Sequence, residues 1–526
     1  MSRVWKPFAF AVAALLLATT PGAAQTPQKG GTINSTLWPE PPGIVLGITL
    51  NAPTLLPSSK MFEGLMTYDF NLQPIPVLAE SWTVAPDGLL YTFKLRQNVK
   101  WHDGKPFTAE DVAFTFNEFL PAVHARSKTT FERVKTTAVD PHTVELRLKE
   151  PYAPLIRSFD ALSAAIVPAH IYKGSDFRAN PVNQAPIGTG PFKFKEWRKG
   201  EYIHLVRNDA YWQAGKPYLD GIYYRFIPDS ASRALALETG QVHLAAQTDI
   251  EFVDVARLAK LPNLKVSTGK GWEWNSTISW IEFNHRRKPF DDPRFRQAVM
   301  FALDREFMRT NIFFGLAKVA TGPVQASSPF YEPDVPKYSL DLAKSAALLD
   351  EMGLKPDANG VRARVKLLGL PYGELWNRVS EYVRQALGKV GIQVTLEASD
   401  VAGWGQKFAN WDYDMVVTFL SMLADPALGV SRTYVTPNIR KGVLFTNTSG
   451  YSKPEVDELF AKAAGSTDDA VRKQLYSRVQ KIIAADVPVA WTVEIEWPTI
   501  TSAKLHNVTI NGFGPNDSFA DAWLEK

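Results

Sequence analysis

The sequence of 526 residues contains no cysteine. This absence excludes a disulfide framework, a thiol nucleophile, a cysteine-based metal site and the lipid-modified cysteine of a lipoprotein. Long hydrophobic runs are also missing, because no apolar stretch approaches the roughly 20 residues that a membrane-spanning helix needs. We therefore expect the mature chain to be a soluble protein without covalent cross-links.

A strong charge of one sign is absent as well. The chain has 58 Lys and Arg against 54 Asp and Glu, which gives a formal net charge of +4. Its basic residues do not gather into a dense stripe of the kind that nucleic-acid-binding proteins present to phosphates. The composition therefore gives no support to a nucleic-acid partner.

The motifs of common enzymes and cofactor sites do not occur. There is no G-x-S-x-G nucleophile motif and no G-x-x-x-x-G-K phosphate loop. The segment Gly188-Thr189-Gly190 lacks the third glycine of a dinucleotide fingerprint, and Pro191 follows it, which suits a turn. The eight His residues are scattered, and none pairs at the i, i+4 spacing of a helical zinc site. We expect no catalytic residue, no cofactor and no metal ligand.

One pair of acids keeps an enzyme hypothesis open. Glu494 and Glu496 lie two apart on a predicted strand and therefore share one face. Two carboxylates so placed can serve as the catalytic pair of a secreted hydrolase. A solvated strand face explains them more simply, since charged side chains are mostly exposed.

The first 24 residues have the three-part layout of a secretory signal peptide. Arg3 and Lys6 form a short basic start, and residues 8–17 follow as an apolar run. Small residues at 22–24 then precede Gln25, which is the pattern of a cleavage site. Cleavage there lowers the formal charge from +4 to +2. Secretion without a lipid anchor indicates free diffusion in the periplasm of a Gram-negative bacterium.

The mature chain is long enough for two or three compact units. Its first half contains short strands, such as residues 91–95, which alternate apolar and polar after the turn at Asp87-Gly88. Thr108 is predicted to cap a helix, because Glu110 and Asp111 then favour the positive end of the helix dipole. This region reads as predominantly β structure with short helices.

The second half has a different pattern. Residues 361–368 and 392–396 read as strands, and the apolar positions between Leu375 and Val390 mark a helix that Gly391 ends. A strand, a helix and a strand in this order form a βαβ unit with a right-handed crossover. We therefore predict an α/β architecture of at least two lobes.

Several long blocks resemble a known family. Residues 99–112 read VKWHDGKPFTAEDV, with Trp101 at a position where that family usually has Phe. The other matching blocks lie at residues 78–82, 87–88, 91–96, 188–192, 208–212, 283–284, 289–298 and 451–457. Together they make the chain similar to the extracellular solute-binding proteins of family 5, which include dipeptide, oligopeptide and nickel binders of ABC importers.

The resemblance implies the two-lobe fold of periplasmic binding proteins, in which two crossing strands form a hinge and the ligand lies between the lobes. Lobe I takes residues 25–275, with a peripheral subdomain at about 65–180, and lobe II takes residues 276–494. The chain then returns to lobe I over residues 495–526. His102 belongs to a peripheral-subdomain motif and is expected outside the ligand cleft.

The resemblance also implies candidate ligand contacts. Peptide binders of this family hold the amino terminus of the ligand with an acid shortly before an Asp-Pro-like turn. In this chain Leu423 or Ala424 stands at that position, and Asp425 belongs to the turn itself. The residues expected to contact the ligand are Trp38, Trp404, Phe419, Ser421, Arg432 and Trp491.

These residues favour a carboxylate-bearing ligand. A buried ammonium without a countercharge would cost several kcal/mol, which argues against ordinary peptides, whereas Arg432 can bind a carboxylate through two hydrogen bonds. We therefore expect a monomeric protein that delivers a modified peptide, an opine-like compound or another carboxylate-bearing solute to the permease of an ABC importer. A nickel or metal-chelate carrier of the same fold and a secreted hydrolase remain the alternatives.

Overall fold

The computed structural model describes residues 26–49 and 51–526, so the predicted signal peptide lies outside the described residues. The strands of this part of the chain form sheets of seven, six and four strands and two short two-stranded ribbons. None of the helices in the described ranges is long and apolar enough to cross a membrane.

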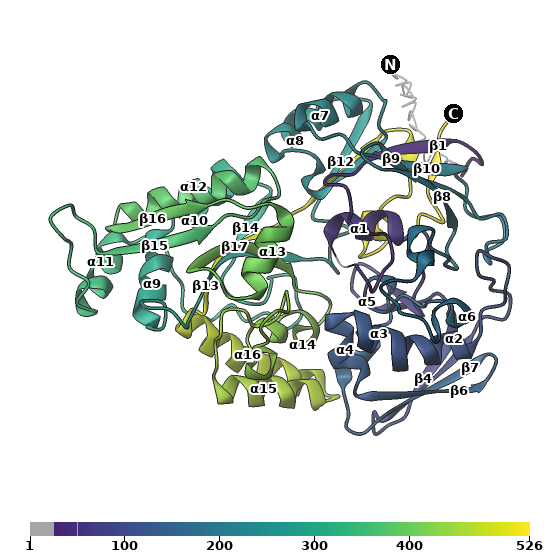
Figure 1. Cartoon of the computed structure of the whole chain (residues 1–526), viewed down its shortest axis with the longest axis horizontal. Helices are drawn as coiled ribbons and strands as arrows, with labels where there is room; N and C mark the ends of the chain where they lie inside the picture. Colours follow the sequence, from purple (N-terminus) through teal and green to yellow (C-terminus); the bar gives the residue numbers. More distant parts are fainter. Residues whose placement is uncertain (1–25, 50) are drawn as a thin grey trace, which may run out of the picture.

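The seven-stranded sheet, on the right in Figure 1, has the order β12-β19-β11-β1-β10-β9-β8. Its strands are β1 (Thr32–Thr36), β8 (Phe192–Arg198), β9 (Tyr202–Arg207), β10 (Gly221–Arg225), β11 (Leu244–Ala246), β12 (Leu264–Thr268) and β19 (Pro498–Ser502). The accompanying helices are α1 (Ala52–Ser58), α7 (Ser230–Glu238) and α8 (Phe252–Leu258), and the ribbon strands are β2 (Met66–Tyr68), β3 (Pro74–Pro76), β20 (Leu505–His506) and β21 (Trp523–Leu524).

The four-stranded sheet lies below it in Figure 1, with the order β4-β5-β7-β6. Its elements are β4 (Ala79–Val84), β5 (Leu90–Leu95), β6 (Val134–Asp140), β7 (Thr143–Leu148), α2 (Ala109–Phe114), α3 (Leu120–Val123), α4 (Ala125–Phe131), α5 (Ala161–Ala164) and α6 (Ala169–Tyr172). The predicted helix start is confirmed, because Thr108 is the N-cap of α2 and its backbone N–H donates to Asp111 Oδ2 at 2.9 Å. This sheet and the seven-stranded sheet share one hydrophobic core.

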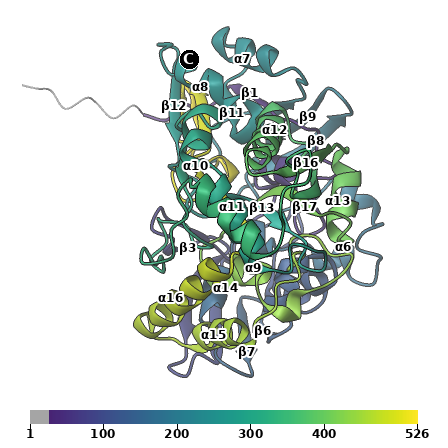
Figure 2. The same cartoon turned by 90° about the vertical axis from the view of Figure 1, so that its left-hand side faces the viewer.

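The six-stranded sheet has the order β14-β18-β13-β17-β15-β16 and its own core. Its strands are β13 (Thr277–Phe283), β14 (Ala317–Val319), β15 (Ala363–Leu368), β16 (Ile392–Glu397), β17 (Met415–Ser421) and β18 (Val489–Ile495). Its helices are α9 (Pro293–Ala302), α10 (Arg305–Phe307), α11 (Leu342–Glu351), α12 (Glu374–Gly388), α13 (Val401–Ala409), α14 (Pro426–Gly429), α15 (Pro454–Gly465) and α16 (Asp469–Asp486). Figure 2 looks onto this part of the molecule, with α15 and α16 at its lower edge.

The predicted βαβ unit is confirmed in the six-stranded sheet. β15 and β16 pair in parallel from Ala363↔Ile392 to Leu368↔Glu397, and α12 connects them. The helix buries one face, which includes Leu375, Trp376 and Val379. The loop after β15 therefore leaves the carboxyl end of a parallel strand, which is where α/β proteins commonly bind ligands.

The chain passes twice between the two large sheets. Residues 269–276 lead from β12 to β13, and residues 496–497 lead from β18 back to β19. β13 and β18 are antiparallel neighbours, so both passages emerge at adjacent positions of the six-stranded sheet. The two halves of the molecule are thus joined by a pair of short crossings.

Candidate ligand-binding site

A cavity of about 120 Å³ lies where the two halves meet, and we call it the central cavity. α1 and its preceding residue approach it from the seven-stranded side, whereas β17, α13 and the loop after β15 approach it from the six-stranded side. The first crossing contributes Trp274 and Asn275. The further lining residues include Asn51, Leu55, Gln247, Tyr372, Trp404, Phe419, Ser421, Arg432, Leu444 and Phe445.

Three neighbouring cavities share walls with the central cavity. One, next to the second crossing, shares Phe419 and Tyr372 and adds Trp38 and Trp497. Another shares Tyr372 and extends outward along α13. The third has a volume of about 460 Å³, shares Arg432 and reaches α4 of the first half. The interface between the two halves is therefore hollow along much of its length.

A group of aromatic rings forms part of the cavity walls. The half-buried Phe419 ring stacks on Trp376 with a centroid distance of 5.0 Å and an interplanar angle of 18°. Trp497 meets Phe419 edge-on at 5.6 Å, and its indole N–H donates to Thr277 Oγ1 at 2.9 Å. Tyr372 approaches the same ring at 6.2 Å. Such apolar walls with few polar groups are typical of small-molecule sites.

The structure brings most of the predicted contact residues together. Trp404, Phe419, Ser421 and Arg432 line the central cavity. Trp38, which is 37% exposed, lines the neighbouring cavity, and Phe419 is part of both walls.

Trp491 is not among the described residues that line these cavities. It stands in β18 opposite Trp280 of β13 and is fully buried in the core of the six-stranded sheet. Its indole N–H donates to the Tyr434 hydroxyl at 3.0 Å, so both its ring and its polar group are occupied by packing. Trp497, at the second crossing itself, lines the neighbouring cavity instead.

Arg432 lies on the wall between the central cavity and the cavity that reaches α4. It is 9% exposed, and its guanidinium donates from Nε to Gly429 O at 2.9 Å and from Nη2 to Ser421 O at 3.0 Å. These two bonds fix the orientation of the side chain. They also place a positive charge beside the end of β17.

The residues before the Asp-Pro turn are apolar and buried. Leu423 and Ala424 pack in the core that the seven- and four-stranded sheets share. Asp425 has the structural role expected for it, because it caps α14 by accepting from Ala427 N at 3.0 Å. No carboxylate therefore lines the cavities at positions 423–424 of the described chain.

Two indole N–H groups on the central cavity have no hydrogen-bond partner within the described residues. They belong to Trp274 and Trp404, whose side chains are 1% and 3% exposed. A buried donor without an acceptor costs free energy. Both N–H groups therefore keep a donor capacity that the described chain does not use.

Sequence reasoning missed several lining residues, notably Tyr372, Trp274, Gln247 and Trp497. A signal existed for Tyr372, because it follows the first strand of the predicted βαβ unit at its carboxyl end. The tryptophans of the two crossings carry no such signal, since a packing tryptophan and a cavity tryptophan look alike in a sequence.

The two acids considered as a catalytic pair, Glu494 and Glu496, are each engaged by a different partner in the scaffold. Glu494 is half-buried and accepts from Ala326 N at 3.0 Å, and burial raises its pKa to about 7. Glu496 lies beyond the end of β18 and pairs with Lys318 at 2.8 Å. Within residues 26–49 and 51–526, no group of three or more His, Asp or Glu side chains is placed to hold a metal ion.

Two lobes joined by two crossings, with an aromatic cavity between them, define a two-lobe binding protein. The first lobe contains the seven- and four-stranded sheets, and the second contains the six-stranded sheet with its helices. The chain belongs to the bacterial extracellular solute-binding proteins, family 5, whose family model matches residues 73–447. It is a solute-binding protein of ABC importers, a class of binding proteins rather than enzymes, whose members bind peptides or other organic solutes.

Three known proteins illustrate the similarity. The glutathione-binding protein GsiB of Escherichia coli O1:K1 is 31% identical over 481 residues, which cover 89% of this chain and 90% of that protein. The oligopeptide-binding protein AppA of Bacillus subtilis, solved with a nonapeptide, has a TM-score of 0.84 at 27% identity and covers 95% of this chain and 100% of its own. AgaA from A. tumefacien R10, solved with agropinic acid, has a TM-score of 0.83 at 26% identity and covers 94% and 99%.

Proposed function

We propose that this protein captures a small carboxylate-bearing organic solute, such as a modified peptide or an opine-like compound, between its lobes. The observation that supports this proposal is the distribution of charge on the cavity wall. Arg432 lies on that wall, while Leu423 and Ala424 occupy the place where peptide binders of the family hold an acid. A carboxylate buried there gains a countercharge, whereas a free ammonium would have none at that position.

Arginine suits this role because its planar guanidinium binds a carboxylate through two parallel N–H···O bonds. The indole N–H groups of Trp274 and Trp404 can donate to further oxygens of the same ligand. Glutathione and agropinic acid, the compounds named for GsiB and AgaA, both carry carboxylates. Their chemistry supports the proposed ligand class.

The mature protein, on this proposal, is a periplasmic monomer released by cleavage before Gln25. Lobe I comprises residues 25–275 and 495–526, with a peripheral subdomain at about 65–180, and lobe II comprises residues 276–494. The short crossings serve as the hinge. A ligand that touches both lobes binds the closed state preferentially and shifts the population toward it. The closed protein then docks on the permease of an ABC importer in the inner membrane.

Calorimetry with reduced glutathione and a panel of small carboxylates tests the proposed charge recognition. Arg432→Ala should weaken binding by about 2–5 kcal/mol, because the carboxylate of the ligand loses a buried partner. Arg432→Lys keeps the charge but loses the two-bond geometry, so its affinity should lie between those of the wild type and Arg432→Ala. Equal affinities for all three folded proteins would exclude Arg432 as the carboxylate partner.

A further inference from the structure

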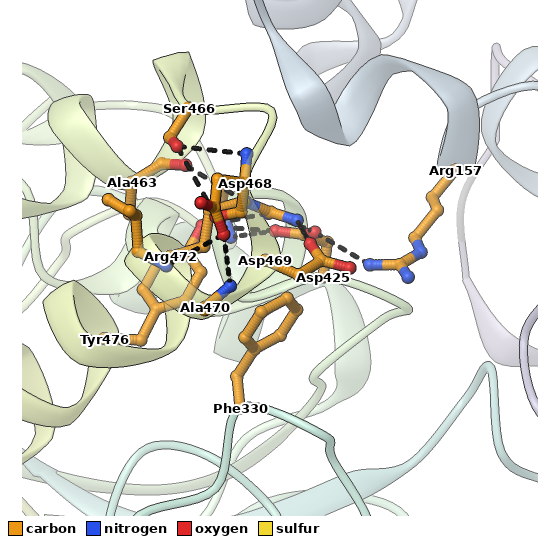
Figure 3. A network of polar contacts seen from close by, with 12 residues as sticks. Arg157, Phe330, Asp425, Ala463, Ser466, Asp468, Asp469, Ala470, Arg472 and Tyr476 are labelled. Atoms are coloured by element: carbon orange, nitrogen blue, oxygen red, sulfur yellow. Dashed lines mark hydrogen bonds and ion pairs between the residues drawn. The ribbon is translucent and has the colours of Figure 1, made fainter.

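An ion-pair network connects the peripheral subdomain of the first lobe to the second lobe (Figure 3). Arg157 ends the 3₁₀ segment Ala153–Arg157 and extends its guanidinium toward Asp425, which lies just after β17. The distance from Arg157 Nη1 to Asp425 Oδ2 is 3.1 Å. Two residues that are 268 positions apart thus meet across the interface between the lobes.

The second lobe holds Asp425 through partners of its own. Arg472 of α16 donates from Nη2 to Asp425 Oδ2 at 2.5 Å, and the Tyr476 hydroxyl donates to Oδ1 at 3.3 Å. Asp425 is fully buried, and the Arg472 side chain is 3% exposed. The carboxylate is therefore oriented and neutralised without any contribution from the first lobe.

Arg157 differs from these partners in its exposure. Its side chain is 16% exposed in the present arrangement. If the lobes separate, Arg157 can regain water while Asp425 keeps Arg472 and Tyr476. Neither the closed nor the open state then contains a buried charge without a partner. An unpaired buried charge is what makes the loss of a buried ion pair so costly. A contact of this kind can form and break with the lobes.

We propose that Arg157 and Asp425 form a closure latch, an ion pair made only when the lobes are closed. The proposal rests on the lobe closure proposed above. Neither residue is among the described residues that line the cavities, so the latch acts on the closed population and not on the ligand. Because apparent affinity scales with the binding-competent fraction, loss of the latch weakens binding of every ligand by the same factor.

The absence of cysteine allows a direct test by electron–electron distance measurement. Spin labels on Lys135→Cys in β6 and Lys473→Cys in α16, both exposed positions, report the separation of the lobes without background labelling. The background variants are Arg157→Gln and, as a matched control, Arg362→Gln. Arg362 is 13% exposed and pairs with Asp350 at 2.5 Å inside the second lobe.

In the ligand-free protein, Arg157→Gln should move the distance distribution toward the open state, whereas Arg362→Gln should leave it as in the wild type. The dissociation constant for reduced glutathione should rise about two- to fivefold in Arg157→Gln, the range of a partly exposed ion pair. Identical distributions for Arg157→Gln and the wild type would overturn the latch. A wild-type distribution that glutathione binding leaves unchanged would instead contradict lobe closure itself.

Discussion

In the blocks that carry the family resemblance the buried polar groups find partners within the fold, whereas two indole N–H groups on the walls of the central cavity do not. In residues 99–112, Asp111 accepts hydrogen bonds from Thr108 N, Ala169 N and the Trp101 indole. His102 accepts from Gly188 N through Nδ1 and contacts Gly190 O through Nε2 at 3.0 Å. On the cavity wall, by contrast, the indole groups of Trp274 and Trp404 have no partner in the described chain.

The recognisable blocks also converge on one another. Thr189, Tyr211 and Trp212 come from two separate blocks, and all three donate to the buried carboxylate of Glu63. The comparison teaches that residues which make the family recognisable, such as Asp111, Thr189 and Tyr211, stabilise the scaffold. The residues that we propose to contact the ligand, such as Trp404, Phe419 and Arg432, lie outside those blocks.

The largest predicted effect is a loss of stability when the tight packing of the scaffold is disturbed. A Cβ added at Gly188 would lie 1.9 Å from Met61 O, a backbone atom that cannot move aside. Gly188→Ala should therefore destabilise the fold by more than about 4 kcal/mol, within the range of the most severe substitutions. Gly322→Ala is the matched control, because nothing in the described chain lies within 4 Å of its added Cβ. Thermal unfolding compares the two, and a Gly188→Ala protein as stable as the control would contradict the tight packing.

A second scaffold effect depends on pH. Burial raises the pKa of Glu63 from 4.5 to about 7, although hydrogen bonds from Tyr211, Thr189 and Trp212 oppose the shift. Between these two values folded Glu63 binds more protons than unfolded Glu63, so its contribution to stability falls as pH rises from about 4.5 to 7. The expected loss is at most a few kcal/mol, since one pKa unit corresponds to about 1.4 kcal/mol.

Glu63→Gln removes this titration. The variant should be less stable overall, but its stability should depend less on pH across the same window. Melting temperatures of the wild type and Glu63→Gln measured from pH 4.5 to 7 report the difference between the two profiles. Parallel profiles would show that Glu63 does not titrate as described.

Substitutions on the cavity wall should change ligand affinity more than they change the stability of the fold. Tyr372 lines three of the connected cavities and shares the walls of two of them with Asn51 of the first lobe. Tyr372→Ala should weaken ligand binding by about 1–3 kcal/mol through lost apolar contact. Tyr372→Phe keeps the ring and should lose much less. Calorimetry and thermal unfolding on both variants separate the two readouts, and a large loss of stability with unchanged affinity would place Tyr372 in the scaffold.

The smallest effect concerns the indole N–H groups. Trp404→Phe removes a donor on the central cavity, and Trp376→Phe removes one that is equally without a partner in the described ranges but is not part of the lining. Both changes remove a similar volume. Only Trp404→Phe should weaken binding, by about 0.5–1.5 kcal/mol, the net contribution of one hydrogen bond. Equal affinities for the two variants would show that the Trp404 N–H does not meet the ligand.

Sequence patterns correctly predicted those structural features that depend on residues close in sequence. The helix cap at Thr108 and the β15-α12-β16 unit depend on residues close in sequence, and both follow the expected positions. Whether a given tryptophan faces the cavity depends instead on contacts between segments that are distant in sequence. Trp491 and Trp497 lie six positions apart near the same crossing, and only the pairing of β18 with β13 decides that Trp491 faces the core.

The partners of Asp425 were equally beyond prediction. Its role in the turn followed from the Asp-Pro sequence, but Arg157 and Arg472 reach it from distant segments that only the assembled lobes bring together. The same holds for Glu63, whose three donors come from blocks more than 100 positions away. Long-range polar contacts of this kind follow from the packing of the lobes, which no local pattern encodes.

Native mass spectrometry of the protein purified from the periplasm tests the central claim most directly. The account predicts a 1:1 complex with a small organic compound that carries at least one carboxylate, and that Arg432→Ala reduces its occupancy. A stoichiometric nickel complex, or a bound compound with amines and no carboxylate, would contradict the proposed charge recognition between the lobes.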